Sequence, residues 1–312
     1  MSLPEPLVIP LWPPAANPVM RVHLPSSLPA GASVPAILVL SGGGFFTCAG
    51  SGGETPAWAA SKGMVGIDVE YACVNGGQKG PGPNPARVRG EIIRPHALAP
   101  MPDGGRCFPQ CMYDASRAVR LVRKLAADGE LPVDPTRVIV CGYSSGGTVA
   151  SLLATRWDQS YMAPEADDLR STISCRPDRV ALCYSVNSCL PEADTLMKAD
   201  GSATTLAFSL HNLLGDEDKD EQMQRELSAT LHARESSPPL FIWTTEEDEI
   251  VPAAHSVLMH RAALDANGQS VLHVFKNDPN VALHGYSHGQ GLALDNPVLG
   301  GWSEEMLEWL SG

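Results

Sequence analysis

The chain lacks long apolar runs and has few basic residues. None of its hydrophobic stretches approaches the ~18 uninterrupted apolar residues of a membrane-spanning helix. Its 312 residues include 22 Lys and Arg against 35 Asp and Glu, a formal net charge of −13. Because nucleic acids and anionic lipids require a basic surface, this charge argues against either as the main partner. A small or neutral substrate is compatible with it.

The sequence also lacks a CxxC pair, which argues against a zinc finger or a thioredoxin-type site. The cysteines are scattered, at positions 48, 73, 107, 111, 141, 175, 183 and 189. Cys141 and Cys183 lie in apolar, strand-like runs, which is typical of inert core residues. Large intracellular enzymes keep their thiols free, so we expect no disulfide; the alternative is a bond from Cys107 to Cys111 or Cys73.

Targeting and repeat signals are missing as well. The N-terminal segment MSLPEPLVIP has neither the basic region nor the apolar core of a signal peptide, and we therefore expect a cytoplasmic protein. We find no internal repeat and no low-complexity linker that would divide the chain. The expected organisation is a single domain over residues 1–312.

Short apolar runs alternate with segments of helical spacing. The expected strands cover residues 36–40, 64–71, 137–141, 179–186, 239–244 and 271–275, and the expected helices cover residues 113–127, 148–157, 254–266 and 303–310. Strands with continuous apolar patterns, separated by helices, predict a mostly parallel sheet covered on both faces. The fold class is therefore α/β.

Two segments interrupt this alternation. Residues 74–110 are rich in glycine and proline, which is typical of a surface loop or a binding loop. Residues 190–235 form a partly helical, cap-like insertion with an acidic run at 216–221. The run fails the EF-hand pattern, because Glu221 stands where that loop needs glycine and Leu227 where it needs glutamate. We interpret it as a solvated helix N-terminus.

The clearest chemical signal is the run Gly142-Tyr143-Ser144-Ser145-Gly146-Gly147. It has the G-x-S-x-G pattern and lies between an apolar strand and a helix of small residues, which is the setting of a nucleophile elbow. Such a turn needs small residues two positions before and after the nucleophile. Gly142 and Gly146 meet this need for Ser144, whereas Ser145 would have Tyr143 two positions before it. The alternative is a glycine-rich turn without chemistry.

A second glycine run, SGGG at 41–44, follows the first long strand. Acyl transfer builds negative charge on a carbonyl oxygen, and two preorganised backbone N–H groups must point at that oxygen. Glycines let the backbone approach closely. We expect an oxyanion hole formed by the N–H groups of Gly43, Gly44 and Ser145; the alternative is a flexible turn.

An orienting acid should follow a late strand, because the chain order of such sites is serine, acid, histidine. The segment TEEDEIVP at 245–252 supplies four consecutive acids. Asp248 is favoured because residues 250–252 turn the chain inward behind it. Glu246, Glu247 and Glu249 remain alternatives.

The base is expected in the loop after the last strand, which contains His284 and His288. Gly289 and Gly291 give the backbone freedom beyond His288 that a base poised over the serine needs, so His288 is favoured. A zinc site at this pair lacks a third ligand on a defined scaffold.

These motifs resemble the α/β-hydrolase esterases of the acetylxylan-esterase and dienelactone-hydrolase-like group. The matching segments are SGGGF at 41–45, GYSSGG at 142–147, RPDRVALCYSV at 176–186, HNLLG at 211–215, EEDEIVP at 246–252 and HGQGLAL at 288–294. Together they cover roughly residues 35–310. The D-x-x-V-P pattern of the family maps to Asp248, and its H-G-x-G-L pattern maps to His288.

The resemblance implies an α/β-hydrolase fold and a serine carboxylic-ester hydrolase that removes short, acetyl-like groups through an acyl-enzyme. The expected partner is a small ester, and an acylated sugar is one candidate. The expected reaction needs no cofactor or metal. Phe45 and Tyr143 are the expected substrate-binding residues, with Phe46 also crowding the acyl side. The alternatives are an amidase or peptidase with the same triad, and a non-catalytic ligand-binding protein of this fold.

Overall fold

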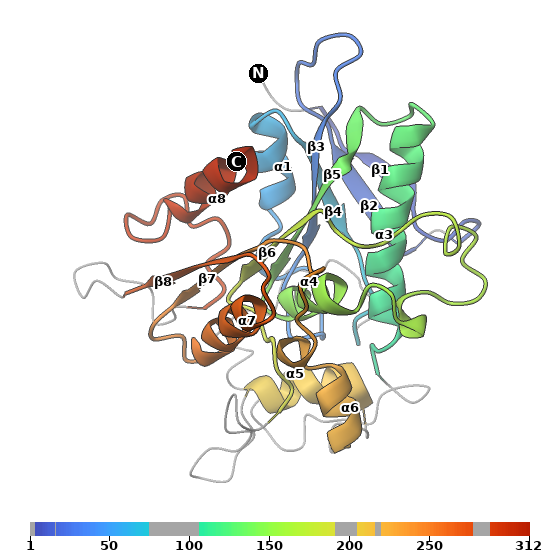
Figure 1. The fold of residues 1–312 in the computed structure, drawn as a ribbon. Coiled ribbons are helices and arrows are strands. Elements are labelled where there is room, and N and C mark those ends of the chain that lie inside the picture. Colours follow the sequence, from blue (N-terminus) through green and yellow to red (C-terminus); the bar gives the residue numbers. More distant parts are fainter. Residues whose placement is uncertain (1–3, 16, 75–105, 191–204, 216–219, 277–287) are drawn as a thin grey trace.

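The structure is a computed structural model that describes residues 4–15, 17–74, 106–190, 205–215, 220–276 and 288–312 (Figure 1). Most of the expected loop at 74–110 and part of the insertion at 190–235 therefore lie outside the described residues. No helix within these ranges is long and apolar enough to cross a membrane.

A sheet of eight strands runs through the described part of the chain, in the order β1-β2-β4-β3-β5-β6-β7-β8. The strands are β1 (Leu7–Pro10), β2 (Val19–His23), β3 (Val34–Leu40), β4 (Val65–Val69), β5 (Val133–Tyr143), β6 (Arg179–Cys183), β7 (Leu240–Thr245) and β8 (Ser270–Phe275). All neighbouring strands from β4 to β8 are parallel, and β2 pairs antiparallel with both β1 and β4. This confirms the predicted α/β class with a mostly parallel sheet.

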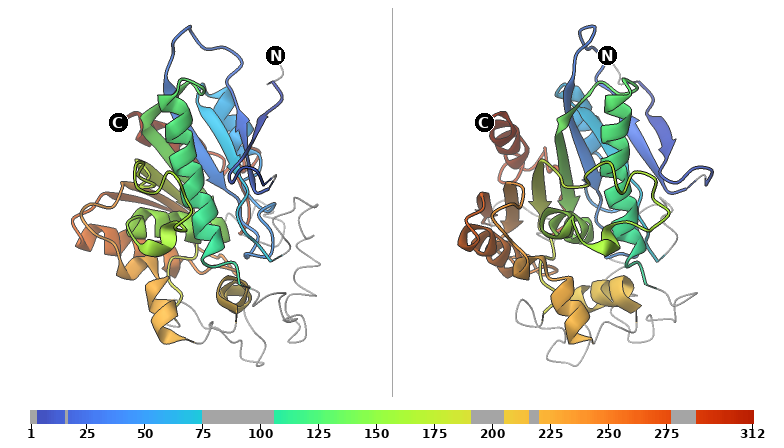
Figure 2. Two further views of the ribbon diagram at one scale, coloured as in Figure 1. Left: turned by 90° about the vertical axis from the view of Figure 1, so that its right-hand side faces the viewer. Right: turned by 45° about the vertical axis from the view of Figure 1, so that its right-hand side comes forward.

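Helices cover both faces of the sheet (Figures 1 and 2). One face carries α1 (Thr55–Ser61) and α8 (Trp302–Ser311), and the other carries α3 (Gln110–Ala127), α4 (Ser145–Arg156) and α7 (Ala254–Asp265). Each face has its own buried apolar cluster, because successive side chains of a strand point to opposite sides. Ile37 and Val39 pack toward α1 and α8, whereas Leu38 packs toward α3 and α4.

The antiparallel strands β1 and β2 and helix α1 were missed by the sequence analysis. The strands are short, and they lie in a proline-rich segment that carries no strong period. Arg21 of β2 lies opposite Asp68 of β4 and forms an ion pair with Glu70, with 2.7 Å between Nη1 and Oε1, so charge pairing joins this added edge to the parallel sheet.

The insertion contributes α5 (Thr205–Leu214) and α6 (Glu221–Glu226), which lie beyond the carboxyl ends of the parallel strands, at the bottom of Figure 1. Asp220 caps α6: its Oδ1 accepts from the N–H groups of Gln222 and Met223, at 2.8 and 3.2 Å. This agrees with the interpretation of the acidic run as a helix start, although residues 216–219 lie outside the described ranges.

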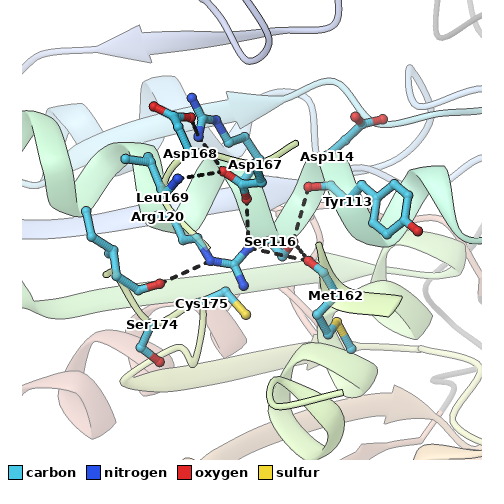
Figure 3. Close-up of polar contacts among 12 residues, drawn as sticks. Tyr113, Asp114, Ser116, Arg120, Met162, Asp167, Asp168, Leu169, Ser174 and Cys175 are labelled. Carbon is cyan, nitrogen blue, oxygen red and sulfur yellow. Dashed lines mark hydrogen bonds and ion pairs between the residues drawn. The ribbon is translucent and has the colours of Figure 1, made fainter. Parts of the chain in front are cut away.

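A buried ionic cluster holds α3 against the segment at 160–175 (Figure 3). The Asp167 side chain has no solvent exposure. It forms ion pairs with Arg117 at 2.5 Å and with Arg120 at 3.3 Å. Its Oδ1 also accepts from the N–H of Leu169 at 3.0 Å. Arg117 also pairs with the exposed carboxylate of Asp168 at 2.5 Å. Removing the Asp167 carboxylate would therefore leave Arg120 without a charged partner among the described residues, while Arg117 would keep only this exposed one.

The eight cysteines are all buried and free, so the alternative of a disulfide at Cys107 is wrong for this structure. Cys141 and Cys183 lie diagonally across the β5–β6 pair, with 3.9 Å between their sulfur atoms. Burial raises the pKa of Cys183 well above its usual value, as expected for an inert core thiol.

Candidate active site

The turn between β5 and α4 holds Ser144 in a strained conformation. Its φ is 51° and its ψ is −119°, a region that side-chain-bearing residues rarely adopt. A Cβ at Gly142 would lie 2.6 Å from the carbonyl oxygen of Gly146, and a Cβ at Gly146 would lie 2.1 Å from that of Leu40. Only glycine fits at these two positions. The turn that they allow places Ser144 at the carboxyl end of the sheet.

His288 and Asp248 lie in line with this serine. Nε2 of His288 is 2.9 Å from Oγ of Ser144, and Nδ1 is 2.7 Å from Oδ2 of Asp248. With its proton on Nδ1, the imidazole donates to the carboxylate and leaves Nε2 free to accept from the serine hydroxyl. The structure thus brings together the three residues expected from the sequence.

The loop after β7 fixes the Asp248 carboxylate. Its Oδ1 accepts from the N–H groups of Ile250 and Val251, each at 2.9 Å, while Oδ2 faces the histidine. The alternatives Glu246, Glu247 and Glu249 are exposed, whereas Asp248 is 7% exposed. The alternative base His284 lies outside the described residues.

The backbone beyond His288 is held by three separate contacts. The hydroxyl of Tyr184 accepts from the N–H of Gly291 at 2.9 Å, and the ring of Tyr184 meets the imidazole edge-on at 4.7 Å. Trp302 donates to the carbonyl of Gly291, and Glu54 accepts from the N–H of Leu292. A Cβ at Gly291 would lie 2.1 Å from the Glu54 carboxylate. The sequence analysis expected glycine here for backbone freedom, and the structure shows that the lack of a side chain also permits close packing. The sequence analysis missed Tyr184 and Glu54.

The glycine run at 42–44 passes directly beside the nucleophile. A Cβ at Gly42 would lie 3.0 Å from Cβ of Ser144. The carbonyl of Gly42 accepts from the N–H of Gly50, and the carbonyl of Gly43 accepts from the N–H of Phe46, each at 3.0 Å. In a trans peptide the N–H points away from the preceding carbonyl, so these bonds turn the N–H groups of Gly43 and Gly44 to the opposite side.

Three N–H groups therefore remain for a ligand. Within the described ranges, no acceptor takes the N–H of Gly43, Gly44 or Ser145. Ser145 begins α4, where the helix dipole adds to the positive potential. The arrangement can stabilise the oxyanion that would form on a carbonyl oxygen if Ser144 attacked the carbonyl carbon.

The structure does not place the two expected substrate-binding residues, Phe45 and Tyr143, where they could contact a substrate. Tyr143 has no exposed surface, and its hydroxyl bonds Thr55 at 2.7 Å inside the core. Phe45 is 2% exposed and packs edge-on against Tyr71. The pleat sends Tyr143 to the α1/α8 face, and a left-handed backbone turns Phe45 inward. The exposed aromatic ring is Phe46, which lies 6.4 Å from the ring of Phe208 on α5.

One known family and one curated protein match this chain. The BD-FAE family matches residues 103–263. Endo-1,4-beta-xylanase B of Butyrivibrio fibrisolvens is 29% identical over 269 residues, which cover 86% of this chain and 34% of that protein. The chain thus spans about a third of the length of this curated relative.

Solved structures share the fold over almost the whole chain. An acetyl ester-xyloside bifunctional hydrolase from Caldicellulosiruptor lactoaceticus has a TM-score of 0.70 at 27% identity, covering 99% of this chain and 97% of that chain. Thermogutta terrifontis esterase 2, phosphonylated by sarin, has a TM-score of 0.68 at 21% identity, covering 99% and 95%. At that identity, the second likeness shows the fold alone.

Proposed function

The chain belongs to the BD-FAE family of α/β-hydrolase esterases, and from this premise we propose that it hydrolyses short-chain esters with Ser144 as nucleophile, His288 as base and Asp248 as orienting acid. One observation carries the proposal. The Ser144 oxygen, on a strained turn, lies 2.9 Å from a ring nitrogen whose partner nitrogen lies 2.7 Å from a buried carboxylate.

In the acylation step, Oγ of Ser144 attacks the ester carbonyl carbon while Nε2 of His288 takes the hydroxyl proton. The carbonyl oxygen becomes an oxyanion beside the N–H groups of Gly43, Gly44 and Ser145. One such donor typically contributes on the order of 10²–10³ in rate. The protonated His288 then gives its proton to the departing alcohol, and an acyl-serine remains.

In the deacylation step, a water gives its proton to Nε2 of His288 and attacks the acyl carbon. Collapse of the second oxyanion releases the carboxylic acid, and the proton returns to Ser144. Through both steps, the Asp248 carboxylate accepts hydrogen bonds from two backbone N–H groups and from Nδ1 of His288. It keeps the imidazole in the productive tautomer.

The proposed substrate is an acetylated sugar, in particular an acetylated xyloside. Phe46 and Phe208 lie beside Gly44 and would limit the acyl group to a small size. The name of the Caldicellulosiruptor lactoaceticus protein couples an acetyl ester with a xyloside, and the Butyrivibrio fibrisolvens relative is named as a xylanase. A net charge of −13 is compatible with a neutral carbohydrate.

The test begins with p-nitrophenyl acetate, p-nitrophenyl decanoate and p-nitroacetanilide, each assayed with the purified protein. The proposal expects fast release from the acetate, slower release from the decanoate and almost none from the anilide. A fluorophosphonate should add to the tryptic peptide that contains Ser144. Acetate release from acetylated xylo-oligosaccharides then tests the sugar substrate directly.

Each other outcome has a clear meaning. Preference for the anilide would replace the esterase by an amidase. No turnover of any substrate together with no labelling of Ser144 would leave a ligand-binding protein of this fold. Turnover of aryl acetates without acetate release from the oligosaccharides would refute the sugar substrate but keep the esterase.

A further inference from the structure

Helix α5 of the insertion reaches the glycine run through one side chain. Asn212 is 4% exposed, and its Nδ2 donates to the carbonyl oxygen of Gly44 at 2.8 Å. A Cβ at Gly44 would meet Oγ of Ser209 at 3.2 Å and the ring of Phe208 at 3.7 Å. The insertion therefore packs directly on the backbone expected to bind the oxyanion.

The backbone at this contact is strained. Gly44 has a φ of 62° and Phe45 a φ of 58°, so two successive residues are left-handed. Glycine adopts this conformation freely, but an aromatic residue does so at a cost of about 1–3 kcal/mol. Such a turn persists only where neighbouring groups hold it in place.

The two carbonyl groups of the strained turn are both held by hydrogen bonds. The carbonyl of Phe45 accepts from the N–H of Val74 at 2.9 Å and from the thiol of Cys107 at 3.4 Å. For the carbonyl of Gly44, the donor is the Asn212 amide. Without this donor, the peptide between Gly44 and Phe45 could rotate toward a less strained conformation. That rotation would disturb the hydrogen bond from the N–H of Phe46 to the carbonyl of Gly43, and this bond orients the peptide that carries the N–H of Gly44.

Asn212 is itself fixed by the start of α3. Its backbone carbonyl accepts from the N–H of Cys107 at 3.1 Å, and that of Leu213 accepts from the N–H of Phe108 at 3.0 Å. These bonds satisfy carbonyl groups in the last turn of α5, which have no partner within the helix. The amide of Asn212 therefore reaches Gly44 from an anchored helix end.

We propose that Asn212 is a positioning residue for the oxyanion hole, acting through the carbonyl of Gly44 on the direction of the Gly44 N–H. The inference rests on the proposed function, because an oxyanion forms only if the chain transfers acyl groups. Asn212 touches no reacting atom. Its effect should appear in the transition state and not in the binding of the ground-state ester.

The test compares Asn212→Ala and Asn212→Asp with the unmodified protein on p-nitrophenyl acetate and on an alkyl trifluoromethyl ketone. The ketone adds to the serine and forms a stable tetrahedral oxyanion. We expect kcat/KM to fall about 10- to 100-fold, somewhat less than the loss of a whole oxyanion donor. The Ki of the ketone should rise by the same factor, while KM changes less than about twofold because the loss is confined to the transition state.

Asn212→Asp keeps the size of the side chain, so it remains informative if the alanine variant does not fold. Asn187→Ala is the matched control, because Asn187 is also buried and its Nδ2 also donates to a backbone carbonyl, that of His255. This control should lose stability without a change in the Ki of the ketone.

Two results would overturn the inference. One is an aspartate variant with unchanged kcat/KM; the other is a fall in kcat/KM that leaves the Ki of the ketone unchanged. Failure of the proposed function is distinguishable, since the unmodified protein would then neither turn over the acetate nor bind the ketone.

Discussion

We predict that replacing His255 with leucine makes unfolding of the protein less sensitive to mild acid. His255 lies in the first turn of α7, with no solvent exposure. Within the described residues, neither of its ring nitrogens has a hydrogen-bond partner. Burial lowers the pKa of His255 to about 4, although the neighbouring Asp248 carboxylate acts in the opposite direction.

The sign follows from proton binding in the two states. Between pH 6.5 and pH 4, the unfolded chain binds a proton at His255 and the folded chain does not. The free energy of unfolding therefore falls as the pH falls through this window. With these two pKa values, the loss between pH 7.5 and pH 5 is about 2 kcal/mol. Leucine does not titrate, so the variant should be spared this loss.

The assay is urea unfolding followed by tryptophan fluorescence, at pH 7.5 and pH 5.0, for the unmodified protein and His255→Leu. Burial raises the pKa of Asp114 to about 6, which favours the folded state in acid, but both proteins share this group and it cancels in the difference. His260→Gln is the control, because His260 is only partly buried and its Nδ1 lies 2.9 Å from the Ser270 hydroxyl. Equal losses for the unmodified protein and His255→Leu between the two pH values would refute the reasoning.

Three further predictions concern the nucleophile, the ionic cluster and the acyl side of the site. Ser144→Ala should lower esterase kcat by about 10⁴-fold or more, measured with p-nitrophenyl acetate; Ser145→Ala should be mild, and labelling of Ser145 by a fluorophosphonate would contradict the assignment. Asp167→Asn should lower the free energy of unfolding by about 3 kcal/mol in urea, because buried Arg120 loses its charged partner and buried Arg117 keeps only the exposed Asp168 carboxylate; a loss below about 1 kcal/mol would show that the cluster is screened. Phe208→Ala should raise kcat/KM for decanoyl relative to acetyl esters, and an unchanged ratio would place the acyl group elsewhere.

Much of the central sheet could be predicted because its strands are buried on both faces and read as continuous apolar runs. The run at 179–186 shows the limit of this signal. The strand β6 ends at Cys183, since Tyr184 adopts a φ of 40° and leaves the sheet. Its ring can then meet His288 and its hydroxyl can hold Gly291. An apolar pattern reports burial, which continues past the strand, and it does not report the change in backbone direction.

The candidate site divides in the same way. Ser144 and the glycines around it could be found from the sequence. A strained turn requires small residues within a few positions of the nucleophile, and these residues are visible as a local motif. Phe45 and Tyr143 are next to such turns in the sequence, yet the side chain of each is buried in the core. Asn212 lies 168 positions from Gly44, so only the folded chain reveals their contact. The turn that carries the proposed nucleophile is thus encoded locally, whereas the backbone at Gly44 is held by a side chain from an insertion far along the chain. The proposal implies that a change in that insertion alters the rate of ester hydrolysis while every motif of the site stays intact.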